Sequence, residues 1–189
     1  MRFEYLLNRE YITLDTKERN LEFRPIHKDG ISIYCGNYSI DKYLTERAYY
    51  EHIRKISFVY LVYLDEEIIG FFSIKISKIS LPLENDFESS NENDEFGALL
   101  LQNLAIRQGY QGHGFGSNVL EFLVGLVFGY GKSINLRFLI LNAVKDKVDW
   151  YKKRNFLTVN KDELKDASPT VFMIMDFIDL DKIKEISEG

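Results

Sequence analysis

A short glycine-rich segment holds the residues whose types and spacing best suit binding chemistry. Gln111 is followed by glycines at positions 112, 114 and 116, and then by Ser117. The segment lies between an apolar run over residues 97–106 and a second apolar run that reaches about residue 130. A strand, a glycine loop and a helix in this order predict an anion site, because glycine lets backbone N–H groups at a helix start approach a phosphate. A tight turn without a ligand is the alternative.

Two familiar phosphate-binding patterns do not fit this segment. The dinucleotide fingerprint requires G-x-G-x-x-G, but Gly112 and Gly114 are followed by Ser117, and no acidic residue ends the next predicted strand. The P-loop pattern that would end in Gly131-Lys132-Ser133 requires a glycine where Leu126 stands. Dinucleotide binding and nucleotide hydrolysis are therefore not predicted.

A second motif runs from Asp149 to Phe156 with the sequence DWYKKRNF. The first motif, Q-x-x-G-x-G after a strand that ends in Leu-Ala-Ile, resembles the acetyl-CoA-binding motif of the GNAT family of N-acetyltransferases. The second is similar to the F-Y-x-x-x-G-F ending of that family, with Asn155 in place of the glycine. Asn also accepts left-handed backbone geometry, so we expect the turn to be kept. The resemblance extends over about residues 58–177.

The resemblance implies acetyl-CoA as the acetyl donor and assigns its contacts. In the family, the backbone of the strand binds the pantetheine, and the amides of the glycine loop bind the pyrophosphate. Asn142, at the end of a later strand, is a further candidate contact. The implied cofactor-binding residues are Leu104, Ala105, Ile106, Gln111, Gly112, His113, Gly114, Phe115, Gly116, Ser117 and Asn142. No metal site is predicted.

The resemblance also assigns Tyr151 as the general acid. A tyrosine with a pKa near 10 stays protonated at neutral pH and can donate to the departing thiolate; a packing role on an amphipathic helix is the alternative. Attack by an amine also requires that the amine lose a proton. The strand over residues 97–106 contains no carboxylate, and its Gln102 and Asn103 can only orient a water. Glu95 lies in an acidic segment, and no base is assigned.

The acceptor is less directly encoded. The segment from Tyr34 to Ala48, with Cys35-Gly36 near its start, resembles one bacterial branch that includes toxins that acetylate aminoacyl-tRNA and pair with a ribbon-helix-helix antitoxin. Such toxins are expected to carry a basic surface, whereas this chain has a net charge of −5. The favoured acceptor is therefore a primary amine of a small molecule or protein. A tRNA-acetylating toxin and a non-catalytic acyl-CoA-binding module remain the alternatives.

The chain length predicts a single domain over residues 1–189, and the hydrophobic periodicity predicts a mixed α/β (α+β) class. The resemblance implies that this is an N-acetyltransferase domain. The expected architecture is a central mixed, mostly antiparallel sheet with a parallel pair at the cofactor groove, flanked by helices. The predicted elements are weak strands at 3–7 and 11–14, a helix at 39–56, a hairpin at 57–64 and 68–77, a strand at 97–106, a helix at 117–130 closed by Gly129 and Gly131, a strand at 134–143, a helix from a cap at Asp146 to 154, and antiparallel strands at 156–159 and 170–177.

The composition indicates in which compartment the protein acts and which partners it can have. Cys35 is the only cysteine, so no intrachain disulfide can form. The N-terminus lacks the pattern of a signal peptide, and the apolar stretch at 119–130 is too short to span a bilayer. Residues 84–95 are predicted to form an acidic surface loop: they carry six acids and no base, and the other residues sum to +1. We therefore expect a cytoplasmic protein without a membrane partner, with no nucleic acid except tRNA under the toxin alternative, and with a homodimer left open.

Overall fold

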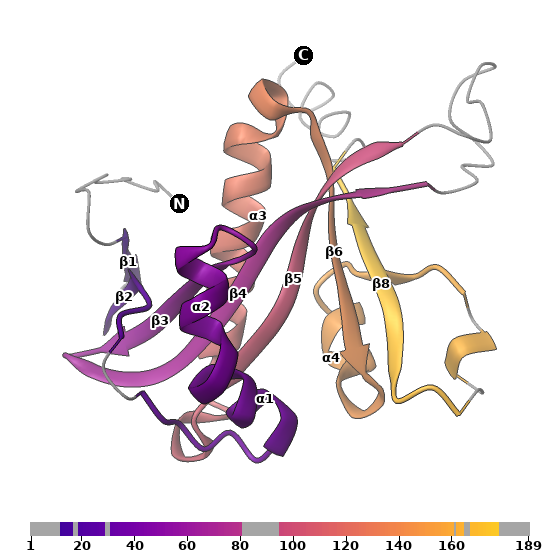
Figure 1. Cartoon of the computed structure of the whole chain (residues 1–189). Helices are drawn as coiled ribbons and strands as arrows, with labels where there is room; N and C mark the ends of the chain where they lie inside the picture. Colours follow the sequence, from indigo (N-terminus) through magenta and orange to yellow (C-terminus); the bar gives the residue numbers. More distant parts are fainter. Residues whose placement is uncertain are drawn as a thin grey trace, which may run out of the picture. The chain divides into compact units, whose positions relative to one another are not determined.

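The computed structural model describes residues 12–16, 19–28, 31–80, 95–160, 162–164 and 167–177 (Figure 1). The strands are β1 (Ile12–Thr16), β2 (Arg19–Pro25), β3 (Phe58–Leu64), β4 (Glu67–Ile79), β5 (Phe96–Ile106), β6 (Leu136–Val144), β7 (Leu157–Thr158) and β8 (Thr170–Asp176). The α-helices are α1 (Tyr38–Tyr43), α2 (Tyr49–Ile53), α3 (Phe115–Ile134) and α4 (Val148–Lys152). Short 3₁₀ turns lie at Gln108–Tyr110, Lys145–Lys147 and Asp162–Leu164.

The eight strands form one sheet in the order β1-β2-β3-β4-β5-β6-β8-β7. Strand β5 pairs with β6 in parallel, whereas the pairs β1–β2, β2–β3, β3–β4, β6–β8 and β7–β8 are antiparallel. Parallel neighbours need a crossover connection, and α3 supplies it. The predicted fold class, a mostly antiparallel mixed sheet with a parallel pair, is confirmed.

The chain divides into two compact units. The first consists of Met1–Lys75 and Gln102–Phe122, and the second consists of Ile76–Leu101 and Leu123–Gly189. Strands β4 and β5 and helix α3 each continue from one unit into the other. The assignment of residues 1–189 to one acetyltransferase domain stays a prediction. Among the described helices, none combines the length and the apolar character needed to cross a membrane.

The helix predicted over residues 39–56 forms in three consecutive segments of the first unit. Asn37 caps it, because its side-chain oxygen accepts hydrogen bonds from the backbone N–H groups of Ser39 and Ile40. Helix α1 then passes through a π-helical turn, Leu44–Ala48, into α2. Leu44 and Ala48 are buried in a core cluster with residues of β3 and β4. The apolar side of this helix therefore covers the hairpin.

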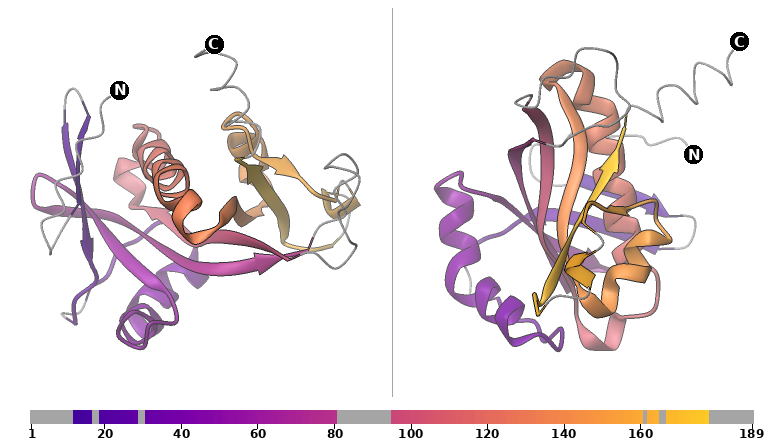
Figure 2. Two further views of the ribbon diagram at one scale, coloured as in Figure 1. Left: turned by 90° about the horizontal axis from the view of Figure 1, so that it is seen from above. Right: turned by 90° about the vertical axis from the view of Figure 1, so that its right-hand side faces the viewer.

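Successive residues of β4 serve opposite faces of the sheet in the first unit, because side chains alternate along a strand. Phe71 belongs to the core cluster that contains Leu44 of the α1–α2 segment. Phe72 packs on the opposite side, where its ring centre lies 5.1 Å from that of Phe23 and 6.0 Å from that of Phe122 on α3. Figure 2 shows α1 and α2 on one face of β3 and β4, and the start of α3 on the other.

A glycine in β4 allows the end of β5 to come close. A Cβ atom at Gly70 would collide with the carbonyl oxygen of Ala105 and would lie 2.8 Å from Cδ1 of Ile106. Ala105 and Ile106 are two of the predicted cofactor contacts. The missing side chain at Gly70 therefore sets the position of this part of β5.

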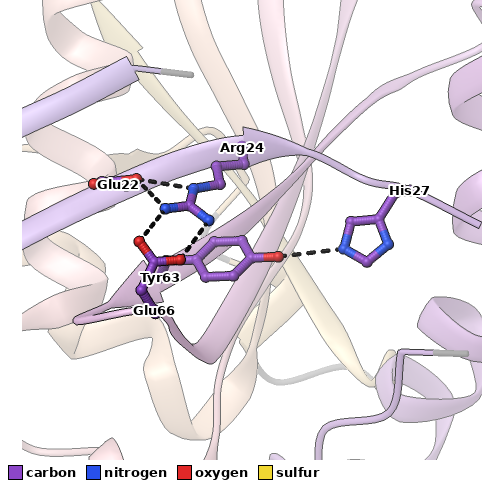
Figure 3. Close-up of polar contacts among 5 residues, drawn as sticks. All are labelled: Glu22, Arg24, His27, Tyr63 and Glu66. Atoms are coloured by element: carbon purple, nitrogen blue, oxygen red, sulfur yellow. Dashed lines mark hydrogen bonds and ion pairs between the residues drawn. The ribbon is translucent and has the colours of Figure 1, made fainter. Parts of the chain in front are cut away.

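Strand β2 was not predicted, and a charged cluster ties it to the β3–β4 hairpin (Figure 3). Arg24 donates to Glu66 at 2.9 and 2.7 Å and to Glu22 at 2.8 Å. Its guanidinium lies 4.4 Å from the ring centre of Tyr63, whose hydroxyl lies 3.3 Å from Nε2 of His27. Hydrogen bonds to Glu66 and Glu22 raise the pKa of Arg24 further above its ordinary value. The sequence prediction missed β2 because its charged and apolar residues alternate over only a few positions.

In the second unit, β6 lies between β5 and β8. Ala98, Phe138 and Ile140 form its buried cluster. Arg137 on β6 donates to the carboxylate of Asp176 on β8 through Nη2 at 2.7 Å and Nε at 3.0 Å. Strands β7 and β8 pair in antiparallel fashion, which confirms the predicted closing pair.

Two local predictions are wrong. Helix α3 does not close at Gly129 and Gly131 but continues to Ile134, where Asn135 follows with a left-handed φ of 53°. Asn tolerates this conformation, so it can end a helix, whereas a glycine can also keep helical geometry. Asp146 does not cap a helix: it lies in a 3₁₀ turn and pairs with Lys147 at 2.8 Å.

Two further predictions fall largely outside the described residues. These are the strand at 3–7 and the acidic surface loop at 84–95, of which only Glu95 is described. The carboxylate of Glu95 pairs with Nζ of Lys78 at 2.6 Å, and both side chains are exposed.

The close approach at Gly70 yields a stability prediction. Gly70→Ala should lower the free energy of unfolding by about 1–3 kcal/mol, because the added methyl group overpacks the contact with β5. Gly129→Ala is the matched control, since a Cβ there meets nothing within 4 Å and alanine favours helix by about 0.5–1 kcal/mol. Urea denaturation followed by the fluorescence of Trp150 measures both changes. Equal stability of the two variants would contradict the packing argument.

Candidate active site

The C-terminal part of β5 leads directly into the glycine loop within the first unit. The last residue of β5 in parallel register with β6 is Leu101, and Gln102–Ile106 continue the strand in the first unit. After the strand, the backbone N–H of Arg107 donates to the carbonyl of Ile69 at 2.7 Å, and that of Gln108 donates to the carbonyl of Tyr34 at 2.9 Å. These bonds fix the exit of the chain from the sheet.

The side chain of Gln111 holds three segments together. Its Nε2 donates to the carbonyl oxygens of Cys35 and Ile106, each at 2.8 Å. The amide therefore links the segment before α1, the end of β5 and the first residue of the loop. This role positions the loop, and a direct contact between Gln111 and the cofactor stays a prediction.

The loop after Gln111 has the open backbone that an anion site requires. Gly112 and Gly114 have φ values of 80° and 90°, and a Cβ atom on either would meet nothing within 4 Å. Larger residues rarely adopt this conformation, so glycine is needed at both positions. Backbone N–H groups of Ser117 and Asn118 donate to the carbonyl of Gly114, and α3 begins at Phe115. The first N–H groups of a helix have no acceptor within the helix, and its dipole favours negative charge there.

His113 and Phe115 differ in exposure. Nδ1 of His113 lies 2.9 Å from the carbonyl oxygen of Gln111. Because a carbonyl oxygen only accepts, Nδ1 carries a proton and donates it to this oxygen. Nε2 does not take part in this bond. The ring of Phe115 is buried. His113 can thus offer a side-chain contact to a ligand, whereas Phe115 contributes its backbone.

Gln102 was not among the predicted cofactor contacts, but its side-chain oxygen is a candidate for one. Its Oε1 is buried and has no hydrogen-bond partner in the described part of the chain. A buried acceptor without a donor is unfavourable unless a ligand or water supplies one. The pantetheine chain of acetyl-CoA carries amide N–H donors, and the glycine loop suits its pyrophosphate. The residues of the first unit therefore fit this cofactor.

Tyr151 lies in the second unit, on α4. Its ring packs edge-on against Trp150 and Phe156, with ring centres 4.8 and 5.5 Å apart. Asn155 has a φ of 65°, which confirms that Asn replaces the glycine of the motif in a left-handed turn. Burial raises the pKa of Tyr151 to about 12, against the opposing charge of Arg154. The hydroxyl is therefore protonated at neutral pH, as a general acid must be.

The remaining predicted contact and the cysteine have simple surroundings. Asn142 is exposed on β6, in register with Phe172 of β8, and its contact with a ligand stays a prediction. The backbone N–H of Cys35 donates to Oδ1 of Asp41 at 3.0 Å, and burial raises the pKa of the Cys35 thiol to about 11. The thiol is thus a poor nucleophile. The described residues contain no cluster of three or more His, Cys, Asp or Glu side chains that could hold a metal.

The cradle yields a binding prediction. Gly114→Glu should abolish measurable binding of acetyl-CoA, because the left-handed backbone would be strained and a carboxylate would repel the pyrophosphate. Gly109→Glu adds the same charge at a nearby open position without a left-handed φ, and it should bind within about threefold of the wild type, a difference of about 0.7 kcal/mol. Calorimetric titration with acetyl-CoA compares the variants. Tight binding by Gly114→Glu would place the pyrophosphate elsewhere.

Comparisons with known proteins agree with this geometry. The model of the acetyltransferase (GNAT) family matches residues 23–156. A tRNA-acetylating toxin of Mycobacterium tuberculosis is 28% identical over 119 residues, which cover 63% of this chain and 72% of the toxin.

Solved structures share the fold. A bacterial toxin superposes with a TM-score of 0.71 at 16% identity, over 87% of this chain and 95% of the toxin. AtaT in complex with acetyl-methionyl-tRNA superposes with a TM-score of 0.67 at 16% identity, over 86% of this chain and 98% of AtaT. Since the family model spans the chain from within β2 to Phe156, including the glycine loop and Tyr151, the protein belongs to the acetyltransferase (GNAT) family.

Proposed function

We propose that this acetyltransferase transfers the acetyl group of acetyl-CoA to the α-amino group of an aminoacyl-tRNA. Acetyl transfer from acetyl-CoA follows from the family. The choice of acceptor rests chiefly on the similarity to the tRNA-acetylating toxin. The net charge favoured a primary amine of a small molecule or protein, with aminoacyl-tRNA as an alternative. The similarity to the toxin favours aminoacyl-tRNA instead.

The chemistry of β5 supports an acceptor of low basicity. This strand carries no carboxylate between Phe96 and Ile106, so it offers no strong base to a reacting amine. An α-amino group has a pKa of about 8, whereas a lysine-type amine has a pKa of about 10.4. At neutral pH an α-amino group is already neutral in a sizeable fraction of molecules. An enzyme without a carboxylate on this strand is therefore better matched to an α-amino group than to a polyamine or a lysine.

The segment that resembles the toxin branch is joined to the cofactor loop. Cys35 receives the hydrogen bond of Gln111 through its carbonyl and reaches Asp41 through its N–H. Asn37, two residues after Cys35, caps the start of α1. The motif over residues 34–48 therefore has a structural reason to occur together with the glycine loop, which supports the resemblance to that branch.

Net charge is a weak objection to a tRNA acceptor. Six of the acids lie within residues 84–95, and the rest of the chain sums to +1. Electrostatic attraction of RNA depends on the local surface, because physiological salt screens charges over about 8 Å. A single acidic segment therefore does not exclude a phosphate-binding surface elsewhere.

The reaction forms a bond between the amine nitrogen and the acetyl carbon and breaks the carbon–sulfur bond of the thioester. The amine loses one proton, and the departing thiolate gains one. In our proposal, Tyr151 supplies that proton, and the loop from Gln111 to Ser117 holds the pyrophosphate. Backbone amides suit this role, since they are already oriented and lose little entropy on binding.

The same proposal extends to partners and compartment. A toxin of this kind requires a neutralising antitoxin, for which a ribbon-helix-helix protein is the expected class, and it acts in the cytoplasm, where charged tRNA and acetyl-CoA occur together. Titration of a separately purified candidate antitoxin into this protein would test whether the two bind and whether acetyl transfer is inhibited.

The assignment of the acid yields a kinetic prediction. Tyr151→Phe should lower kcat by about 10²–10⁴-fold, the usual contribution of a general acid, and should leave the affinity for acetyl-CoA unchanged. Tyr130→Phe is the control, because Tyr130 is exposed on α3. In the wild type, the raised pKa of Tyr151 predicts no loss of kcat from this group up to about pH 10, since an acid of pKa about 12 is then only about 1% ionised. Wild-type turnover by Tyr151→Phe would reject the assignment.

The acceptor yields the decisive prediction. Incubation with acetyl-CoA and aminoacyl-tRNA should give N-acetylaminoacyl-tRNA, detected by mass spectrometry after ribonuclease digestion. Deacylated tRNA should remain unmodified, because it lacks the amine. The rate should rise with pH through a pKa of about 8, as the α-amino group loses its proton. Acetylation of polyamines or peptide lysines, with none of aminoacyl-tRNA, would instead support the small-molecule or protein acceptor.

A further inference from the structure

The carboxylate of Glu67 bonds to two side chains from the segment just before the glycine loop. Glu67 is the first residue of β4 and follows the tight turn of the β3–β4 hairpin. Its Oε1 accepts a hydrogen bond from Nη1 of Arg107, and its Oε2 accepts one from the hydroxyl of Tyr110. All three residues belong to the first unit. One carboxylate therefore joins the hairpin to the short 3₁₀ turn that leads into the loop.

The side chain of Tyr110 also reaches the far side of the glycine loop. Its ring centre lies 6.2 Å from that of Phe115, the first residue of α3, and the Phe115 ring is buried. The backbone N–H of Tyr110 donates to the carbonyl of Arg107 at 2.8 Å, which closes the turn. Glu67 thus acts on the entry of the loop through Arg107 and on its exit through the ring of Tyr110.

The chemistry of the three groups fixes which of them donates. An ionised carboxylate only accepts, so Arg107 and Tyr110 both donate to Glu67. The hydrogen bond to Glu67 is the main cause that raises the pKa of Tyr110, so the hydroxyl keeps its proton at neutral pH. Arg107 in turn neutralises the carboxylate. This pairing matters because an unpaired negative charge beside the cradle would repel a pyrophosphate.

A loop with two left-handed glycines benefits from being held at both ends. Glycine loses more conformational freedom on ordering than any other residue, so Gly112 and Gly114 add an entropic cost to binding. Only loop conformations that direct their N–H groups at the pyrophosphate bind it, and the affinity falls with the fraction of molecules in those conformations. Contacts that favour this conformation before the ligand arrives therefore increase the affinity.

We propose that Glu67 is a positioning residue for acetyl-CoA: through Arg107 and Tyr110, its carboxylate keeps the glycine loop in the conformation that receives the pyrophosphate. Its effect is transmitted by these two side chains. The effect is modest, because the side chains of Arg107 and Glu67 are 49% and 50% exposed and an exposed ion pair is weak. The inference rests on the proposed role of the loop in binding the cofactor, and it is independent of the acceptor.

Tyr110→Phe tests this role without a change of charge. It removes the hydroxyl that donates to Glu67 and keeps the ring that packs on Phe115. Tyr50→Phe is the matched control, because Tyr50 on α2 is 62% exposed and its hydroxyl has no hydrogen-bond partner in the described part of the chain. Calorimetric titration with acetyl-CoA should give a Kd about three- to tenfold higher for Tyr110→Phe, as loss of one hydrogen bond implies. Tyr50→Phe should stay within about twofold of the wild type.

A double-mutant cycle on the ion pair tests the part played by charge. Glu67→Gln alone should raise the Kd about threefold, because both donors lose the carboxylate. Arg107→Met should also raise it, and adding Glu67→Gln to Arg107→Met should lower it again, because the unpaired carboxylate is then removed. Glu66→Gln is the control: it removes the same charge one residue earlier, but Glu66 bonds to Arg24 (Figure 3). Its Kd should stay within about twofold of the wild type.

The sign of the Glu67→Gln effect in the two backgrounds decides between the explanations. A general electrostatic effect would tighten binding in both backgrounds, and a packing role would tighten it in neither. Either of these results, or wild-type affinity of Tyr110→Phe, would overturn the inference. Thermal unfolding of each variant confirms that it is folded.

The variant Gly114→Glu separates this inference from the role of the loop itself. If Gly114→Glu binds acetyl-CoA tightly, the loop does not hold the pyrophosphate and both proposals fail. If Gly114→Glu loses binding while Tyr110→Phe keeps it, the loop holds the pyrophosphate and only the role of Glu67 is overturned.

Discussion

The two hydrogen bonds donated by the side chain of Gln111 are the interaction on which the cofactor loop depends. One amide group binds the carbonyl oxygens of Cys35 and Ile106 and thereby joins the distant segment before α1 to the end of β5 and the start of the loop. The left-handed residues Gly112 and Gly114 follow directly, and α3 begins at Phe115, so the bonds of Gln111 hold the loop just before the helix starts. Gly70 contributes from the other side, because it lets the end of β5 approach β4. A polar contact and a missing side chain together place the backbone donors.

This arrangement explains why the candidate cofactor site contains few charged side chains. Backbone N–H groups at a helix start provide fixed donors and a favourable dipole, whereas long cationic side chains would have to be ordered on binding. Side chains instead shape the backbone or meet particular ligand atoms. Gln111 belongs to the first group. Gln102, with its buried and unpartnered acceptor among the described residues, is the candidate for the second.

Local sequence signals were sufficient for the motifs and for most of the elements, although not for β2. The glycine loop, the hairpin, the parallel pair and the left-handed turn at Asn155 were predicted because each depends on residues close together in the chain. The hydrogen bonds from Tyr43 and Ser57 to the carboxylate of Glu51, and the bond from Asn103 to Ser73, were not predicted, since they join residues that are apart in the chain and have no local pattern. Asn103 was interpreted only as a residue that could orient a water.

The choice of acetyl acceptor depends on the local distribution of charge rather than on the net charge of the chain. A net charge of −5 argues against RNA only if the charge is spread over the surface, but the six acids of residues 84–95 account for all of it, since the other residues sum to +1. Screening confines each charge to its neighbourhood. The local chemistry points the other way: β5 has no carboxylate, and its polar side chains, Gln102 and Asn103, are neutral amides. A neutral amide beside the reacting amine does not favour its ammonium form, whereas a carboxylate would. It therefore suits an amine that is already partly neutral at physiological pH, and an α-amino group meets that condition better than a polyamine.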